Sequence, residues 1–551
     1  MHIPIKSLLI GMLACSAMVA CTNEDLPEVD NGNEKGKESY IAVNLKTTNT
    51  GSRATSNSFE DGEVNENLVS GNILFYFFDK DGGQYPVSGA NNYISVPVSS
   101  WTQEGDAANS IEEISSPVLV INESKNVPPQ KILAVLNPPA SLTGSKSLSD
   151  LKALKNAYNY TDPNASTKTF VMTNSTYKHS ATGEEVIATE LSNENICASS
   201  DAAMSKPVDI YVERIAAKVR VGVEYNALPI GETEEVGETE EEQVFTAFSV
   251  GDEYTMSDGS KQAVYAKIKG WEVTNIKNDA FLLKKIDVQW DDTTIGLTWN
   301  DAVNHRSYWA DTETGTTTTH PWSWLTVDNP VTGTNWDYYY ENTGAAKSQL
   351  LVAVDFCDAN GDKVEIAEWF GTKYSIPALK TAIANSLSSQ IYIKASETAT
   401  TATGITGNDI DFEQVSHDVS VVPTGRYWSK AILAEASKDK LFVNAKMETL
   451  TTQQVENIIA GVQHAKIWLQ GGYYYQTIEH FGTTGKTTEF GMVRNHLYDF
   501  TITAISGLGT PVLDETKIIT PEKPADEASY VAARINILSW RVVSDDNVTL
   551  N

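Results

Sequence analysis

The sequence predicts an all-β protein built from β-sandwich domains. Short apolar stretches of strand length, separated by turn residues, recur along most of the chain. Helical periodicity is confined to the windows 149–158, 376–388 and 452–462, and strands do not alternate with helices as they do in a parallel α/β fold. The chain has 551 residues, of which 41% are hydrophobic and 21% charged, so it has material for two or more cores.

The first part of the chain carries four clear strand patterns, at 71–84, which runs into a tight turn, and at 118–121, 131–139 and 170–175. Pro138 and Pro139 end the third of these, because proline cannot donate to a sheet ladder. We place a domain boundary near Pro207. One long strand is expected to follow over 208–221, with a register shift at the alanine pair that begins at Ala216.

The second part opens on an acidic segment, 231–242, which we interpret as a solvated loop. It lacks the Asp/Asn alternation and the spaced carboxylate of a calcium-binding loop. Strand patterns then resume at 266–275, 350–356, 391–395, 441–447, 467–470 and 497–505.

Catalytic and cofactor motifs are missing from the sequence. The eight histidines have no metal-like spacing, and neither a nucleophile elbow nor a dinucleotide fingerprint occurs. The stretch 482–487 resembles a phosphate loop, but its upstream glycine position is His480, so we predict a hairpin turn. We expect no enzyme activity, no cofactor and no metal site.

Two aromatic clusters, 336–340 and 471–475, have the side chains needed to stack on sugar rings. Such clusters more often pack in sandwich cores and edges. Cys197 and Cys357 are far apart in sequence and are expected to be buried small apolar residues, not a disulfide. The net charge of −31 excludes a nucleic-acid partner, because no basic stripe offsets repulsion from a polyanion.

The N-terminus has the pattern of a bacterial lipoprotein precursor. A weakly basic lead precedes the apolar run 7–20, which is too short to span a bilayer and has the length of a secretory signal. Small residues before Cys21 predict cleavage and lipidation there. Cys15 is an alternative, but it would leave a shorter apolar run. Residues 22–38 are polar and read as a solvated tether.

A first strand over 39–46 is followed by a polar linker, 47–58, that contains Arg53. Exposed, extended backbone and a basic side chain suit a trypsin-like protease, so cleavage between Arg53 and Ala54 would detach this strand. An ordinary exposed arginine is the alternative. Residues 1–53 carry five Lys/Arg and six Asp/Glu, so the remaining chain keeps a net charge of −30. The displaced strand would present the apolar face formed by Ile41, Val43 and Leu45.

The C-terminus offers a strand that could replace it. A proline-containing, charged linker at 520–527 precedes the strand-like stretch 530–543. A bulge near Leu538 would bring two apolar sets of opposite parity onto one face, namely Val531, Ala533, Ile535 and Ile537, and Leu538, Trp540 and Val542. We expect donation of this strand to a neighbouring copy. The alternative is that the strand completes the sheet of its own domain.

Several of these segments resemble the fimbrillins of Bacteroides-type bacteria, and most closely the shaft subunits of minor fimbriae. The resemblance rests on the Cys21 lipobox, Arg53-Ala54 after a first strand, the C-terminal strand, and the motifs at 170–174, 212–219, 306–309, 340–342 and 493–498. It implies two transthyretin-like (Greek-key) β-sandwich domains with a few short helices and a C-terminal donor strand. The implied divisions are a signal peptide at 1–20, a tether and removable strand at 21–53, an N-terminal domain at 54–207, a C-terminal domain at 208–519, and a linker with donor strand at 520–551.

The resemblance also implies an outer-membrane lipoprotein precursor that matures into a cell-surface fimbrium. An arginine-specific protease would cut at Arg53, and copies would join by donor-strand exchange. The implied partners are other copies, anchor and tip accessory subunits, and host or bacterial surface receptors. The expectation is therefore a non-enzymatic pilus subunit. The alternative, a surface glycan-binding lipoprotein of a nutrient-uptake system, would keep its N-terminus and use exposed Trp and Tyr side chains.

Overall fold

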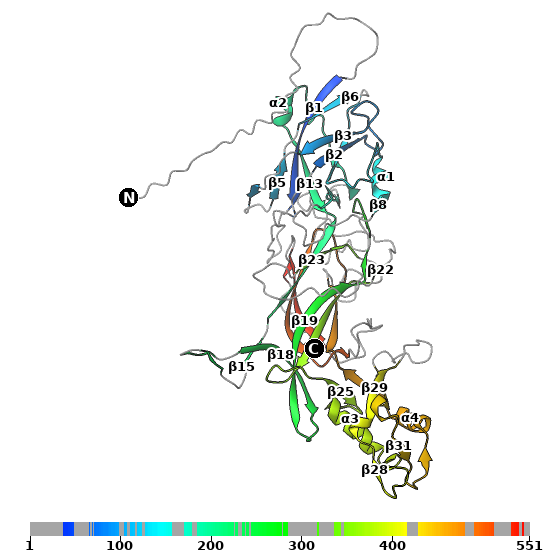
Figure 1. The fold of residues 1–551 in the computed structure, drawn as a ribbon. Helices are drawn as coiled ribbons and strands as arrows, with labels where there is room; N and C mark the ends of the chain where they lie inside the picture. Colours follow the sequence, from blue (N-terminus) through cyan, green and yellow to red (C-terminus); the bar gives the residue numbers. More distant parts are fainter. Residues whose placement is uncertain are drawn as a thin grey trace, which may run out of the picture.

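A computed structural model gives the fold of most of the chain. It describes residues 37–48, 66, 69, 71–98, 104–106, 111–115, 118–123, 127–156, 170–178, 185–224, 226–229, 234–236, 239–241, 244–277, 279–284, 317–318, 336–342, 347–415, 428–479, 490–511, 530–538 and 543–544. The described residues form a long molecule in which β1 and β6 lie at one end and α3 and α4 at the other (Figure 1). The fold is mostly β with a few short helices, as the sequence predicted.

The N-terminal sheet contains ten strands. Along its main path the order is β3-β2-β7-β9-β13-β1-β5-β4, with β12 beside β7 and β6 beside β1. The bounds are β1 Lys37–Thr48, β2 Gly71–Phe78, β3 Tyr93–Val98, β4 Glu104–Asp106, β5 Ile111–Ser115, β6 Val118–Glu123, β7 Lys131–Leu136, β9 Met172–Asn174, β12 Thr189–Glu190 and β13 Val208–Arg214.

The long strand expected over 208–221 is divided at Ile215. Its first half, β13, pairs with β1 and β9 in the N-terminal sheet. Its second half, β14 (Ala216–Val223), pairs with β23 and β35 in another sheet. At the register shift expected at Ala216, the chain therefore leaves one sheet and enters another. Pairing changes there, a few residues beyond the boundary that we placed near Pro207.

The C-terminal part packs two sheets around one core. A five-stranded sheet has the order β23-β14-β35-β37-β38, with β23 Trp336–Tyr340, β35 Leu497–Ser506, β37 Tyr530–Leu538 and β38 Val543–Ser544. An eleven-stranded sheet has the order β29-β30-β33-β25-β26-β18-β19-β24-β34-β36, with β15 beside β18. Its bounds are β15 Asn226–Pro229, β18 Val244–Thr255, β19 Lys261–Thr274, β24 Gln349–Cys357, β25 Ile366–Trp369, β26 Thr372–Ser375, β29 Ile410–Gln414, β30 Trp428–Leu433, β33 Ala465–Trp468, β34 Gly472–Thr477 and β36 Thr510–Pro511.

The remaining strands form small sheets. One has the order β28-β27-β31-β32, with β27 Tyr392–Lys394, β28 Ala402–Gly404, β31 Leu441–Val443 and β32 Thr449–Leu450. Four pairs complete the description: β8 Lys155–Asn156 with β21 Ala280–Phe281, β10 Tyr177–Lys178 with β11 Glu185–Val186, β16 Glu234–Val236 with β17 Thr239–Glu241, and β20 Ile276–Lys277 with β22 Thr317–Thr318. The acidic segment that we expected to be a loop thus contains the short antiparallel pair β16–β17.

The helices are short and begin at side-chain caps. Ser375 and Thr451 cap the N-termini of α3 (Ile376–Ser386) and α4 (Thr452–Ala460), and each accepts a hydrogen bond from a backbone N–H of the first turn. These helices match the predicted windows, whereas the third window forms only α1 (Leu148–Ala153), because Leu154 is extended. Also present are α2 (Ser200–Met204), which the sequence analysis missed, and the 3₁₀ turns η4 (Gly407–Asp409) and η6 (Glu435–Ser437).

The helices α3 and α4 pack on a separate distal core. Their apolar faces bury Leu379, Ile383, Val455 and Ile459 against strands of the neighbouring sheets. A second core fills the C-terminal sandwich around Trp271. The N-terminal core contains residues from beyond the boundary, including Trp336 and Tyr338 of β23. The two main parts of the molecule are therefore interlocked through shared apolar packing.

Candidate functional site

The predicted removable strand, β1, occupies an interior position in the N-terminal sheet. Its first half, from Lys37 to Ala42, pairs antiparallel with β6. Its second half pairs parallel with β13 on one side and antiparallel with β5 on the other. Because β1 has hydrogen-bonded neighbours on both sides, removing it would leave backbone N–H and C=O groups on three strands without their partners.

Ile41, one of the three residues on the predicted apolar face of β1, lies in the N-terminal core. Ile41 is fully buried, together with Leu119 and Ile121 of β6. Register places Val43 beside Val208 and Leu45 beside Ile210. Full burial of one such aliphatic side chain contributes about 1.5–3 kcal/mol. The position of β1 thus combines two backbone ladders with an apolar floor, and we call this position the β1 groove.

The predicted modification residues lie outside the described part of the chain. This applies to Cys21, Arg53 and Ala54. The strand β1 ends at Thr48, and the next described residue is Glu66, so the predicted cut site lies in the segment that joins these two points.

The chain beyond the predicted cut is fixed at Glu66, whose side chain is fully buried. Its carboxylate accepts a hydrogen bond from Lys218 Nζ at 2.7 Å and another from the Tyr338 hydroxyl, and its carbonyl oxygen accepts one from Arg214 Nε at 3.1 Å. Burial opposes ionisation of Glu66, but the Lys218 and Arg214 cations hold its pKa below the usual value. The body of the protein therefore retains its own anchor at Glu66, independent of β1.

The predicted donor strand forms β37 and pairs with its own molecule in the single chain. It runs antiparallel to β35, from Tyr530 opposite Ser506 to Leu538 opposite Leu497. This arrangement corresponds to the alternative in which the tail completes its own sheet. Of the predicted donor residues, Val531, Ala533, Ile535, Ile537 and Leu538 lie in β37, whereas Trp540 and Val542 fall outside the described residues.

The two strands are held unequally. Among the described residues, β37 has on its outer side the two-residue strand β38, whereas the second half of β1 lies between β13 and β5. The described register irregularity of this pair is on β35, between Ile502 and Ala504, whereas the bulge expected near Leu538 lies at the edge of the described residues and stays a prediction. Since β37 is one step from a sheet edge, its release breaks one long ladder, whereas release of β1 breaks ladders on both sides.

A network of buried charges joins the N-terminal and C-terminal parts, and we call it the junction cluster. It consists of Glu66, Glu213, Arg214, Lys218, Lys284, Glu341 and Arg494, each less than 5% exposed. The Arg494 guanidinium pairs in a bidentate manner with Glu341, with Nε 3.0 Å from Oε2. It also donates to the carbonyl oxygens of Leu282 at 3.1 Å and Phe281 at 2.7 Å.

The other members of the cluster are paired in the same way. Lys284 Nζ lies 2.8 Å from Glu213 Oε2, and Arg214 Nη1 donates to Asn495 Oδ1 at 3.1 Å. Burial raises the pKa of Glu213 and lowers the pKa of Lys284, so each depends on the other to remain charged. Three of the cations pair with carboxylates, and Arg214 donates to the Glu66 carbonyl oxygen and to Asn495 Oδ1, so these buried charges are hydrogen-bonded. The cluster is therefore a structural clamp, not a reactive site.

Metal and membrane sites are not found in the described residues. No group of three or more His, Cys, Asp or Glu side chains there is arranged to hold a metal ion. Within the same ranges, no helix is long and apolar enough to cross a bilayer. The segment 480–489, which contains the phosphate-loop-like motif, is not described, but the bridge between Glu479 and Phe490 pairs the chain on its two sides.

The aromatic clusters considered for sugar stacking are largely buried. Tyr338 and Tyr340 of β23, and Tyr473 and Tyr474 of β34, are each less than 8% exposed. These aromatic side chains therefore pack in the protein interior, which is the more common role for such clusters. Of the two cysteines expected to be buried, only Cys357 is, and burial raises the pKa of its thiol to about 12. Cys197 is partly exposed, and the two thiols are not bonded to each other.

Glu272 of β19 lies near the junction and gives the molecule a predicted pH dependence. Burial raises its pKa to about 8, and the neighbouring Asp337 carboxylate acts in the same direction. The folded protein therefore keeps this proton while the unfolded chain, with an ordinary value of 4.5, loses it. The stability contributed by Glu272 is complete below pH 4.5 and is lost as pH rises through about 8.

We expect Glu272→Gln to raise the free energy of unfolding relative to the wild type by roughly 1–3 kcal/mol at pH 9, with a much smaller difference at pH 5. Urea unfolding at the two pH values measures this difference. A constant difference between pH 5 and pH 9 would contradict the assignment. Glu253→Gln, at a solvent-exposed position, serves as the control.

The C-terminal region of the chain matches a known family model. Residues 469–546 match the family model described as "Major fimbrial subunit protein type IV, Fimbrillin, C-terminal". This range includes Arg494, β35 and β37. On this match the C-terminal region of the chain is similar to the fimbrillin family. The resemblance inferred from the sequence motifs is confirmed at this level, and the family is one of fimbrial structural subunits, not enzymes.

The solved structures that match this chain include fimbrial proteins. A fimbrilin from Porphyromonas gingivalis W83 is 13% identical with a TM-score of 0.36, and the alignment covers 93% of this chain and 99% of that chain. The tip fimbrial protein Mfa3 from Porphyromonas gingivalis is 10% identical with a TM-score of 0.29, over 90% and 99% of the two chains. A fimbrial assembly protein from Parabacteroides distasonis ATCC 8503 is 13% identical with a TM-score of 0.30, over 59% and 89%. A comparison with curated proteins found no sequence match.

Three of the motifs that carried the resemblance, 212–219, 340–342 and 493–498, meet in the junction cluster. Glu213 and Arg214 belong to the motif at 212–219, Glu341 to the motif at 340–342, and Arg494 and Asn495 to the motif at 493–498. Sequence reasoning quoted these residues but gave them no role. These charged residues stand in otherwise apolar strands, and this was the signal that could have indicated buried pairing.

Proposed function

We propose that this protein is a structural shaft subunit of a cell-surface fimbrium that polymerises by donor-strand exchange. It is exported as a lipoprotein precursor lipidated at Cys21 and cut between Arg53 and Ala54. The cut frees β1 to leave, and the C-terminal strand of another copy enters the β1 groove. The two main parts are proposed to be transthyretin-like sandwich domains. The proposed partners are further copies, anchor and tip subunits, an arginine-specific protease and surface receptors.

One observation supports this proposal above the others, namely the interior position of β1. The strand β1 has hydrogen-bonded neighbours and is buried at Ile41. Its removal would therefore open a groove of the right shape and polarity for another strand. An incoming strand would restore both ladders, which is the basis of strand addition as a binding mode. The anchor at Glu66 supports the same scheme, because the chain beyond the cut remains attached when β1 departs.

The alternative function, a glycan-binding lipoprotein for nutrient uptake, has weaker support. The Trp and Tyr clusters that motivated it are packed inside the sandwiches. It also requires that β1 and Arg53 remain in the mature protein.

The Ile41→Ala substitution is expected to speed polymerisation of the cut protein. It weakens the hold of β1 on its groove by about 2–5 kcal/mol, the usual range for truncating a large aliphatic side chain in a core. If loss of β1 limits the rate, fibres should form about 30-fold faster or more. Light scattering after protease addition to purified precursor measures this rate.

The matched control is Val120→Ala, because Val120 lies on the neighbouring strand β6 but is 51% exposed. This control should polymerise at the wild-type rate. Equal rates for Ile41→Ala and wild type, after complete cleavage of both, would count against the displacement of β1.

A further inference from the structure

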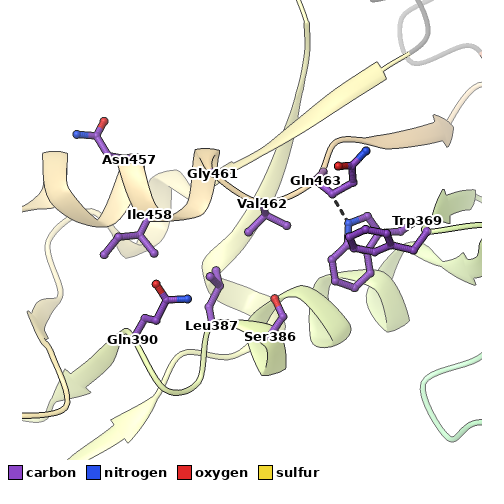
Figure 2. A pocket seen from close by; sticks show the side chains of 10 residues that line it. Trp369, Ser386, Leu387, Gln390, Asn457, Ile458, Gly461, Val462 and Gln463 are labelled. Atoms are coloured by element: carbon purple, nitrogen blue, oxygen red, sulfur yellow. Dashed lines mark hydrogen bonds between the residues drawn. The ribbon is translucent and has the colours of Figure 1, made fainter.

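A pocket with polar and aromatic walls lies at the end of the molecule opposite β1. Its cavity volume is about 450 Å³, within the range of small-ligand sites. It is bordered by the end of α3, by α4 and by the turn between β25 and β26. Figure 2 shows Gln390, Leu387 and Ile458 between the two helices, and Trp369 at one side of the pocket.

The turn that borders the pocket holds an aromatic residue in an unfavourable conformation. Trp369 pairs with Thr372, so Phe370 and Gly371 form a two-residue hairpin loop, with φ angles of 49° and 75°. Both positions are left-handed, and the first normally takes Asn, Asp or Gly. Phe370 is nevertheless 73% exposed to solvent. The left-handed backbone at a bulky residue costs free energy of folding, and because the side chain is exposed, core packing does not offset that cost. This points to a role for Phe370 in binding.

The two aromatic rings are positioned by neighbouring groups. The Trp369 indole Nε1 donates to the carbonyl oxygen of Gln463 at 3.0 Å, which fixes the plane of its ring. The Phe370 ring centroid lies 4.8 Å from that of Trp369, with an interplanar angle of 59°. The pair therefore offers an exposed apolar surface beside the pocket.

The rest of the lining determines the chemistry of the ligand. Among the residues that line the pocket, none carries a charge, whereas Gln390, Asn457 and Gln463 carry side-chain amides. An amide offers both a donor and an acceptor to a hydroxyl group. Within the described chain, the amides of Gln390 and Gln463 make no hydrogen bond with protein groups, which leaves them available. The lining and the net charge of −31 both disfavour an anion.

We propose that this pocket binds a neutral saccharide. One face of a sugar ring is apolar and would contact Phe370 and Trp369, while its hydroxyl groups would exchange hydrogen bonds with the amides of Gln390 and Gln463. A saccharide is favoured over an aliphatic ligand because amides line the pocket, and over a phosphate or carboxylate because cations do not. This site stands apart from the β1 groove and does not depend on polymerisation.

The test uses the uncut precursor on an array of neutral and sialylated glycans, followed by saturation-transfer NMR titration of the strongest neutral glycan. The Phe370→Asn variant is decisive, because Asn tolerates the left-handed backbone and so the thermal midpoint should stay equal or rise. Its binding to the glycan should weaken about tenfold or more. Phe370→Tyr, which keeps the ring, should retain binding.

Met447→Asn is the matched control, because Met447 is also an exposed apolar residue with a left-handed φ of 63°, but it does not line the pocket. It should leave binding unchanged. Saturable neutral-glycan binding that is lost in Phe370→Asn alone supports the proposal. Binding of sialylated glycans alone, no glycan binding, or undiminished binding by Phe370→Asn would overturn it. Loss of self-association in Phe370→Asn, without glycan binding by the wild type, would assign the pocket to contacts between copies.

Discussion

Replacing Arg53 with alanine is expected to abolish fibre formation and to leave folded monomer on the membrane. Without cleavage, β1 stays covalently joined to the body, and the groove that it fills remains closed to any other strand. The tail then has only the partner that it has in the single chain, β35. Electron microscopy of surface fibres, with fractionation of the precursor, measures the result.

The Arg53→Ala result has a matched control and a direct companion measurement. Ser52→Ala changes the neighbouring residue but keeps the basic side chain, and it should form fibres normally. N-terminal sequencing of the wild-type surface protein should give Ala54. Abundant fibres from Arg53→Ala, or a mature wild-type chain that begins at Cys21, would contradict the mechanism and favour the lipoprotein alternative.

Replacing Arg494 with methionine is expected to lower the free energy of unfolding by about 3–5 kcal/mol. The substitution leaves the buried Glu341 carboxylate without its cation. In the unfolded chain the same carboxylate is solvated by water. It also removes the donors to the carbonyl oxygens of Phe281 and Leu282. Urea unfolding followed by tryptophan fluorescence measures the change.

Arg220→Met provides the comparison for Arg494→Met. Arg220 also forms a bidentate pair, with Asp499, but the two side chains are 25% and 16% exposed. Because this pair is partly accessible to solvent, its loss should cost less than that of the fully buried pair, about 1–2 kcal/mol. The double substitution Arg494→Met with Glu341→Gln should recover part of the loss, because it no longer leaves a buried charge unpaired. Equal effects of Arg494→Met and Arg220→Met would show that the junction cluster does not join the two parts.

Local patterns predicted most of the strands and three of the helices correctly. An apolar run such as the one that begins at Lys131 and is stopped by prolines specifies its own conformation, and β7 covers Lys131–Leu136 of it. Capping residues such as Thr451, with Gln454 three positions later, likewise mark a helix start within a few residues of sequence. These signals are local, and this is why a single sequence reveals them.

The junction cluster could not be predicted in this way. Glu66, Arg214, Glu341 and Arg494 come from four distant parts of the chain, and no spacing rule indicates that they meet. The break of the expected long strand at Ile215 depends on the same tertiary contacts, because β13 and β14 pair in different sheets. The left-handed conformation of Phe370 was missed for another reason. Hairpin rules favour Asn or Gly at its position, so they do not predict a hairpin loop with Phe there.

The pairing of β37 bears directly on the proposed donor-strand exchange. Patterning showed a strand suited to an apolar groove, but both the β1 groove and β35 accept such a strand. In one molecule the tail lies against β35. In a fibre, the account requires that it leave that position for the groove of a neighbour.

Cysteine trapping in assembled fibres tests this exchange most directly. Arg534→Cys is combined either with Val120→Cys, on β6 beside the β1 groove, or with Thr501→Cys, which pairs with residue 534 in the single chain. Cys197→Ser removes the partly exposed thiol in both variants. After treatment with a short bis-maleimide, the account predicts a ladder of covalent multimers for the Val120→Cys pair and little product for the Thr501→Cys pair. Cross-linked monomer from the Thr501→Cys pair within fibres, with no ladder from the other, would contradict it.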